Sequence, residues 1–242
     1  MKNTAAKLAG RGVGALALLG VGYLATNWLR YGKVSTRGKP DRLLDRFMPI
    51  YEVREYHETR VAAPVDMAYD AVRAVDLNRS ALVRGIFRAR QLVMGGRDEP
   101  ASPPRPLLAG AIALGWRVLA EVPGREIVMG ALTQPWVANV TFEGLPPGEF
   151  ASFTTPACVK IAFTLSAEPI DAESSILRTE TRAMTTDQYA RERFRRYWTV
   201  VSPAVRLIRI EGLRVARADA ERWAREAREP VQSAMTHAWE EP

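Results

Sequence analysis

The chain has 242 residues, 47% hydrophobic and 25% charged, which excludes a disordered chain and suits one large folded domain or at most two. Its formal net charge of +7 lies entirely in residues 1–42, where eight Lys and Arg face one Asp, while the rest of the chain holds 26 basic and 26 acidic side chains. Because nonspecific nucleic-acid binding needs a basic docking face, this neutral body predicts no nucleic-acid partner.

An uncharged apolar segment, residues 12–29, lies between two arginines near the start of the chain. As a helix it would cover about 27 Å, enough for the core of a bilayer, and Trp28 stands at the expected interface. We therefore expect residues 1–32 to form an N-terminal membrane helix with basic flanks, a single-pass anchor in the membrane whose orientation is undecided. A cleaved signal peptide and a buried helix of the folded domain are the alternatives.

The sequence after this segment divides into a linker, a domain and a tail. Residues 33–49 include Gly38 and Pro40 and are predicted to be a linker. We expect the folded domain over residues 50–228 and a C-terminal tail over 229–242.

Residues 51–62 alternate in character, which predicts a β-strand. One face carries mainly charged side chains, whereas Glu55 and His57 share the parity of Val53 and Val61 and are expected on the covered face. The alternative is that the strand twists at its start, leaving Glu55 at a wet rim and His57 against a backbone carbonyl.

Two short helices are predicted after this strand. Pro64 ends the strand, and apolar residues three and four apart then predict helices over 67–75 and 82–90. The following stretch, 95–110, is rich in Gly and Pro and is expected to be a loop.

Five short runs with strand character follow, separated by Pro and Gly. They are residues 115–124, 125–132, 136–144, 158–170 and 174–184. In the last two, polar and apolar side chains fall on opposite faces, which predicts an antiparallel sheet with one wet face and one covered face.

A long helix should cover that face. Asp187 is the expected N-cap, the helix is predicted over residues 188–227, and Pro203 should kink it. The predicted apolar stripe is Phe194, Trp198, Val201, Val205, Ile208 and Gly212. The arginines at positions 191, 193, 195, 196, 206 and 209 lie largely off this stripe and are expected in solvent.

This element order resembles the START/Bet v1-like superfamily, also known as SRPBCC, which includes polyketide cyclase/dehydrase and lipid-transport proteins. The resemblance rests on HETRVAAPVDMAYDAVRAV, residues 57–75, and ILRTETRAMTTDQYARERFRRYW, residues 176–198, and covers about residues 50–220. It implies an α+β helix-grip fold, in which a curved antiparallel sheet wraps around the long C-terminal helix. The two short helices would close one end of a hydrophobic cavity, with the 95–110 loop near its mouth.

Few residues could carry catalysis. Cys158 is the only cysteine and His57 and His237 are the only histidines, so no metal site and no cofactor are predicted. The sequence also lacks a nucleophile elbow and a phosphate-binding loop. Catalytic residues are therefore unknown, and Glu55 and His57 are candidates because a carboxylate and an imidazole in an apolar pocket can act as acid and base.

Three functions remain open from the sequence. The first is membrane-tethered binding or transport of a hydrophobic small molecule or lipid, the second is a cyclase or dehydratase acting on an apolar substrate, and the third is a structural domain with a filled core. For the first, apolar walls would give affinity and a few polar groups would orient the ligand. The expected lining is His57, Phe163, Leu165, Leu177, Thr179, Thr181, Phe194, Trp198, Val201 and Val205.

Overall fold

The computed structural model describes residues 26, 41, 43–94 and 106–238. The predicted membrane segment, apart from Thr26, and most of the 95–110 stretch lie outside these residues. Within the part of the chain that is described, no helix is both long enough and apolar enough to cross a membrane.

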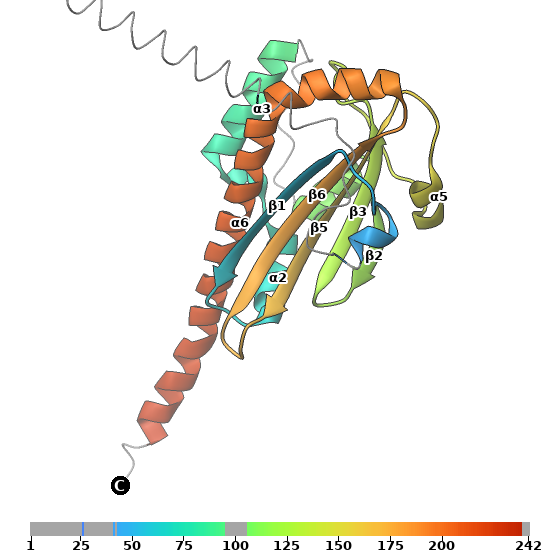
Figure 1. Ribbon diagram of the computed structural model, residues 1–242. Helices are drawn as coiled ribbons and strands as arrows, with labels where there is room; N and C mark the ends of the chain where they lie inside the picture. Colours follow the sequence, from blue (N-terminus) through green and yellow to red (C-terminus); the bar gives the residue numbers. More distant parts are fainter. Residues whose placement is uncertain (1–25, 27–40, 42, 95–105, 239–242) are drawn as a thin grey trace, which may run out of the picture.

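The fold is α+β, built on a curved antiparallel sheet of six strands (Figure 1). The strands are β1 (Val53–Val61), β2 (Arg117–Val122), β3 (Glu126–Thr133), β4 (Phe142–Glu143), β5 (Val159–Pro169) and β6 (Ser175–Thr185). Their order across the sheet is β1-β6-β5-β3-β2, and β4 pairs with β3. The first strand therefore pairs with the last, which brings β1 beside the strand that leads into the long helix.

Four of the five runs predicted as strands after residue 110 are confirmed as β2, β3, β5 and β6. The strand predicted over 136–144 is wrong, because only Phe142–Glu143 pairs. The chain turns there instead, with the N–H of Val137 donating to the carbonyl of Gln134, and Trp136 packs against the cluster around Phe194. Packing of an aromatic side chain thus outweighs the strand propensity of the segment.

The helices are α2 (Val65–Ala74), α3 (Ala81–Met94), α4 (Leu107–Ala113), α5 (Pro147–Ser152) and α6 (Gln188–Ala238), with 3-10 turns η1 (Leu44–Arg46) and η2 (Leu77–Arg79). The two predicted short helices are confirmed as α2 and α3. Helix α4 begins inside the stretch expected to be a loop, and α5 begins at Pro147, which suits a first helical turn because its missing N–H would have no partner there.

Helix α6 begins where the sequence predicts. Oδ1 of Asp187 accepts a hydrogen bond of 2.7 Å from the N–H of Ala190, which confirms the N-cap. Figure 1 shows a sharp bend in the orange part of this helix, and Pro203 lies in its first third, where it removes a backbone donor. The helix continues to Ala238, through most of the segment expected to be a tail.

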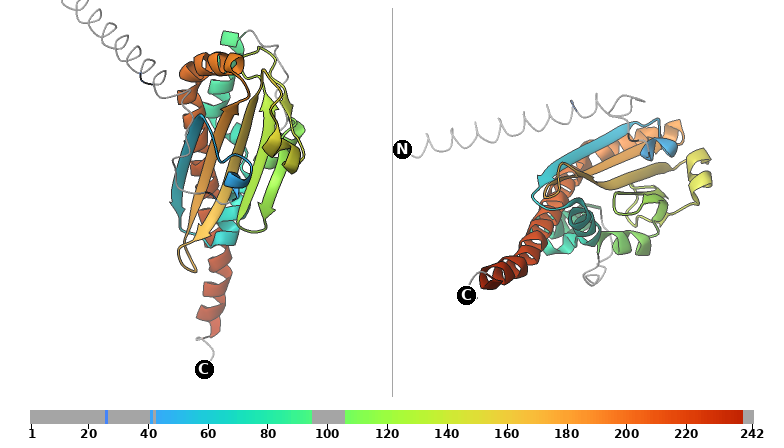
Figure 2. Two further views of the ribbon diagram at one scale, coloured as in Figure 1. Left: turned by 45° about the vertical axis from the view of Figure 1, so that its right-hand side comes forward. Right: turned by 90° about the horizontal axis from the view of Figure 1, so that it is seen from below.

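Helices and turns lie on both faces of the sheet (Figure 2). The inner face carries α2 and α6, and its core includes Leu177 of β6 packed with Ala216 and Ala220 of α6. Small side chains on α6 let it approach α2 and the sheet closely. The outer face carries η1 and α5, whose Leu44 and Phe150 are both fully buried.

The expectation that one face of the sheet is wet is wrong at the end covered by η1 and α5. Arg182 is 1% exposed, Glu180 2% and Lys160 9%, although all three belong to the outer face. Glu180 pairs with Arg182 and with Arg54, and Nζ of Lys160 donates to the carbonyl of Ala151. These charges are tolerated in the interior because each has a partner.

Candidate functional site

The inner face of the sheet carries four polar side chains in two cross-strand pairs. Glu55 of β1 lies opposite Thr181 of β6, and His57 lies opposite Thr179. The spacing of two residues places all four on the same face of neighbouring strands. We call these four residues the inner polar zone.

The acid–base candidates lie side by side within this zone. The Nε2 atom of His57 is 3.6 Å from Oε2 of Glu55, and each side chain is 12% exposed. The parity of the strand therefore places both on the covered face. This separation is longer than a hydrogen bond, but such pairs are often loose in the absence of substrate and tighten when one binds.

Three polar atoms of the zone have no hydrogen-bond partner among the described residues. They are Nε2 of His57, Oγ1 of Thr179 and Oγ1 of Thr181, each almost inaccessible to solvent. The two threonines are 3% and 5% exposed. A buried polar group without a partner costs about 1–3 kcal/mol and is uncommon in folded proteins, so these three atoms mark the inner polar zone as the candidate site.

Apolar side chains continue this face of the sheet onto β5. Phe163 lies opposite Thr181 and Leu165 lies opposite Thr179. The ring of Phe163 is only 4% exposed and packs edge-on against Trp116, with 5.1 Å between the ring centroids. The rings of Phe163 and Trp116 therefore form a packed aromatic floor beside the inner polar zone.

Arg209 of α6 lies over this floor. Its guanidinium carbon is 5.1 Å from the centroid of Phe163, so the expectation that this arginine faces solvent is wrong. Desolvation by surrounding protein atoms lowers the pKa of Arg209 to about 10, partly opposed by the charge of Glu55. Part of the side chain still reaches the surface. Among the described residues, it forms no ion pair or hydrogen bond.

Spacing along the helix could have identified this residue. Arg209 follows Val205 by four positions and precedes Leu213 by four, so it shares their face of α6. Arg191 was also expected in solvent, yet its Nε atom donates to the buried carboxylate of Glu52 at 2.8 Å. The predicted stripe continues from Val205 to Ile208 and Gly212, and it therefore leaves Arg209 off the buried face.

The structure divides the predicted lining into two apolar groups on either side of the polar zone. Phe163, Leu165 and Leu177 belong to the cluster formed with α2 and the later part of α6. Phe194 and Trp198 belong to a second cluster with Val53, Val159 and Ala183, and Val205 packs against it. Val201 is half-buried and belongs to neither cluster. The polar residues predicted to orient a ligand therefore lie between two apolar regions.

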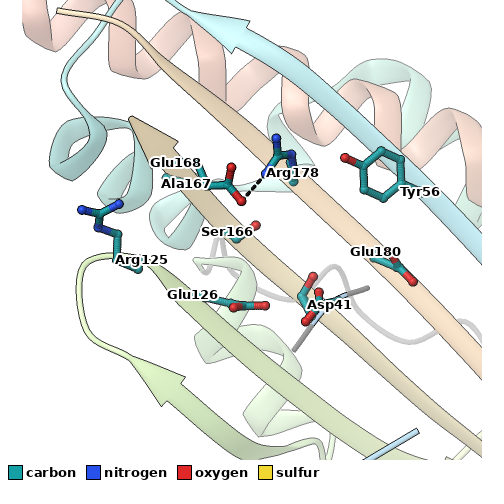
Figure 3. A pocket seen from close by; sticks show the side chains of 10 residues that line it. Asp41, Tyr56, Arg125, Glu126, Ser166, Ala167, Glu168, Arg178 and Glu180 are labelled. Carbon is teal, nitrogen blue, oxygen red and sulfur yellow. Dashed lines mark ion pairs between the residues drawn. The ribbon is translucent and has the colours of Figure 1, made fainter. Parts of the chain in front are cut away.

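A pocket of about 430 Å³ lies on the outer face (Figure 3). It is lined by Asp41, Tyr56, Arg125, Glu126, Thr164, Ser166, Ala167, Glu168, Arg178 and Glu180. Burial, and then the neighbouring carboxylate of Asp41, raise the pKa of Glu126 to about 7. Arg178 pairs with Glu58 and with Glu168. This pocket is charged, with four carboxyl groups and two arginines in its lining, in contrast to the inner face.

The described residues hold few of the side chains that usually bind transition metals, with one cysteine and two histidines. No group of three or more His, Cys, Asp or Glu side chains in them is placed to hold a metal ion. Cys158 is a free thiol whose pKa is raised by burial and then by Glu143 and Asp187.

Comparison with known proteins gives little further information. No family model and no curated protein matches the sequence. Among solved structures, a conserved protein from Geobacillus kaustophilus is 13% identical over 70% of this chain and 96% of that one, with a TM-score of 0.32. Truncated norcoclaurine synthase from Thalictrum flavum is 10% identical over 68% and 90%, with a TM-score of 0.33. An aromatase/cyclase from a Streptomyces species is 16% identical over 70% and 94%, with a TM-score of 0.26.

At these TM-scores the likeness supports no functional conclusion.

Proposed function

We propose that the protein binds a hydrophobic small molecule or lipid between the sheet and α6, with a polar group of the ligand held at the inner polar zone. The observation that carries this proposal is the set of three buried polar atoms, on His57, Thr179 and Thr181, that have no hydrogen-bond partner among the described residues. Apolar clusters on both sides would supply affinity, and the polar atoms would supply orientation.

The apolar surface that such a ligand would bury is enough for measurable binding. At roughly 25 cal/mol per Å², a ligand that buries about 300 Å² of apolar surface gains on the order of 7 kcal/mol. Ordering costs reduce this gain, and hydrogen bonds to the polar zone add to it, which gives affinities near the micromolar range.

Ligand binding can be tested on the full chain. We expect native mass spectrometry and solvent extraction of the purified protein to recover an apolar molecule, and titration with oleyl alcohol to change tryptophan fluorescence. Trp116→Phe should remove most of the signal because Trp116 contacts Phe163, whereas Trp223→Phe should not, because Trp223 lies about 21 Å further along α6 than Arg209, which stacks on Phe163. If no apolar molecule is recovered and the fluorescence stays constant, the protein is not a carrier of this kind.

The proposal includes a helix-grip domain of START/Bet v1-like type and a membrane tether formed by residues 12–29. The apolar character and length of this segment support the tether. We expect the full chain to stay in the membrane fraction through carbonate and high-salt washes, and Leu18→Arg with Leu19→Arg to release it. As a control, Thr4→Arg adds charge outside the segment and should leave the chain in the membrane fraction. Release of the natural chain by salt alone would reduce the tether to an electrostatic contact.

A second function is favoured by one specific contact, the 3.6 Å approach of His57 to Glu55. Such a pair could catalyse dehydration in a cyclase-like reaction. Glu55 would take a proton from the carbon next to a carbonyl, a carbon–carbon double bond would form, and the β-hydroxyl would leave as water with a proton from His57.

This second function has its own test. A phenyl-bearing β-hydroxy ketone would yield a conjugated enone with strong ultraviolet absorbance. We expect Glu55→Gln to abolish turnover while the protein still binds the substrate. Glu58→Gln is the matched control, because Glu58 is exposed on the same strand and faces Arg178 on the outer side. Equal loss in both variants, or no turnover by the natural chain, would leave only the binding function.

A further inference from the structure

Arg209 has an unusual environment for a charged side chain. Its guanidinium lies on the buried ring of Phe163, which also packs against the ring of Trp116. Phe163 in turn lies opposite Thr181 in the sheet, and Thr181 lies opposite Glu55. The cation therefore stands at the edge of the inner polar zone, on the side of β5.

The surrounding side chains compensate the buried charge of Arg209 only in part. The other arginines buried on the sheet are neutralised directly, as Arg182 is by Glu180 and Asp45. Among the described residues, no carboxylate forms an ion pair with Arg209, and the charge of Glu55, which acts on it, offsets only part of the desolvation. Stacking on an aromatic ring stabilises a cation by about 1–2 kcal/mol, whereas burying a charge without a partner costs several kcal/mol.

We infer that the ligand carries a carboxylate, which binds the guanidinium of Arg209 and accepts hydrogen bonds from the hydroxyls of Thr181 and Thr179. This inference rests on the proposed function and specifies the chemical class of the ligand as an apolar monocarboxylate. A guanidinium matches the planar geometry of a carboxylate with two parallel hydrogen bonds. A single arginine with hydroxyl donors suits one negative charge, whereas a phosphate head group carries up to two charges and would call for a second cation.

Access to the site agrees with this assignment. Arg209 is partly exposed, so an entering head group can meet it, while Thr179 and Thr181 are buried. The head group would therefore sit between the guanidinium and the threonines, and the tail would extend over the apolar side chains around Phe163 and Leu165. The carboxylate would also give the two threonine hydroxyls the acceptor that they lack in the described structure.

The test compares oleate with its uncharged methyl ester in the full chain. We expect oleate to bind roughly tenfold or more tightly than methyl oleate, the usual effect of a charge-assisted hydrogen bond. Arg209→Met should abolish this preference without changing the affinity for methyl oleate, which also shows that the variant is folded. Arg206→Met is the matched control, because Arg206 is exposed one turn earlier on the same helix.

The outcomes separate this inference from the proposed function. Equal binding of oleate and methyl oleate by the natural chain, or an unchanged preference in Arg209→Met, would overturn the inference and leave the proposed function intact. Binding of neither would overturn both. If oleyl phosphate binds more tightly than oleate and this advantage depends on Arg209, the head group is a phosphate and the carboxylate assignment is wrong. Because the oleate comparison uses the natural chain, the test holds even if Arg209→Met does not fold.

Discussion

The Nη1 atom of Arg182 in β6 lies 2.5 Å from Oδ1 of Asp45 in η1. The same guanidinium donates to the carbonyl of Met48 and to Glu180, and lies over the ring of Tyr51. Arg182 therefore binds the segment before β1 to the outer face of the sheet. Through this contact, residues that the sequence assigns to a linker become part of the folded unit.

We expect Arg182→Met to lower the free energy of unfolding by about 3–5 kcal/mol, because the variant leaves Glu180 buried with one partner fewer and releases η1. Urea denaturation of the full chain measures this change. Arg178→Met is the control, since Arg178 is 22% exposed and pairs with Glu58 and Glu168, both largely exposed, and should cost less than about 1 kcal/mol. Equal losses in the two variants would show that the contact with η1 adds nothing.

The carboxyl groups of Glu126 and Asp41 in the outer pocket are expected to make the stability of the protein depend on pH. Burial and Asp41 raise the pKa of Glu126 from 4.5 to about 7, so between these values the folded protein keeps a proton that the unfolded chain has released. The contribution of Glu126 to stability is thus fully present below about pH 4.5 and is lost as the pH rises to about 7.

Glu126→Gln should remove this dependence. We expect the variant to match the natural chain at pH 5 and to be more stable at pH 8 by about 1–2 kcal/mol, a value that allows for partial exposure to solvent. Thermal or urea unfolding at both pH values gives the comparison. Glu149→Gln, at an exposed position of α5, should behave like the natural chain at each pH. A difference for Glu126→Gln that is the same at pH 5 and pH 8 would mean that Glu126 does not hold the proton.

Much of the fold follows from local patterns in the sequence. Alternation along β1 correctly places Glu55 and His57 on the covered face, and Asp187 correctly marks the start of α6. These signals are local, since parity needs only neighbouring residues and a cap needs only the next turn. They predict which side chains share a face, and so they predict the inner polar zone.

The same patterns could not predict what covers each face. Arg182 alternates with apolar residues as a solvent-facing side chain would, and its burial depends on Asp45, 137 positions earlier in the chain. Arg209 lies off the predicted stripe, which continues from Val205 to Ile208, and is therefore expected in solvent, yet it stacks on Phe163. Both errors arise because long-range packing decides whether a charge is desolvated, and residue type alone does not.

The turn before β2 predicts a contrast between two glycines. Gly115 has a φ of 101°, and a Cβ atom there would overlap the carbonyl oxygen of Phe142. Gly115→Ala should therefore destabilise the protein by roughly 3 kcal/mol or more, through backbone strain and the displacement of β4. Because Trp116 follows directly, the variant should also alter the fluorescence response to oleyl alcohol.

Gly110 supplies the control for this prediction. It lies inside α4, and a Cβ atom there would meet nothing within 4 Å. Gly110→Ala should stabilise the protein by about 0.5–1 kcal/mol, because alanine loses less backbone entropy in a helix. Thermal unfolding of both variants tests the pair, and a stabilising Gly115→Ala would contradict the geometry of the turn.

The unpartnered threonines of the inner polar zone predict opposite effects on stability and on binding. Valine has nearly the shape of threonine, so Thr179→Val and Thr181→Val would each remove a buried hydroxyl that has no partner among the described residues. We expect each variant to raise the free energy of unfolding of the ligand-free chain by about 1 kcal/mol, because the desolvation cost of the hydroxyl disappears. Thr133→Val should do the reverse, since its Oγ1 donates to the carbonyl of Thr141 at 2.8 Å and both groups would lose that bond.

Binding should change in the other direction at the same two positions. If Thr179 and Thr181 orient a polar group of the ligand, their valine variants should bind oleyl alcohol several-fold more weakly while being the more stable proteins, and Thr133→Val should bind normally. Urea unfolding and fluorescence titration on the same preparations provide both quantities. Loss of stability in Thr179→Val and Thr181→Val would show that their hydroxyls have partners within the fold. Unchanged binding in both would show that the ligand does not use them, because a site that keeps a costly buried hydroxyl for recognition must lose affinity when the hydroxyl is removed.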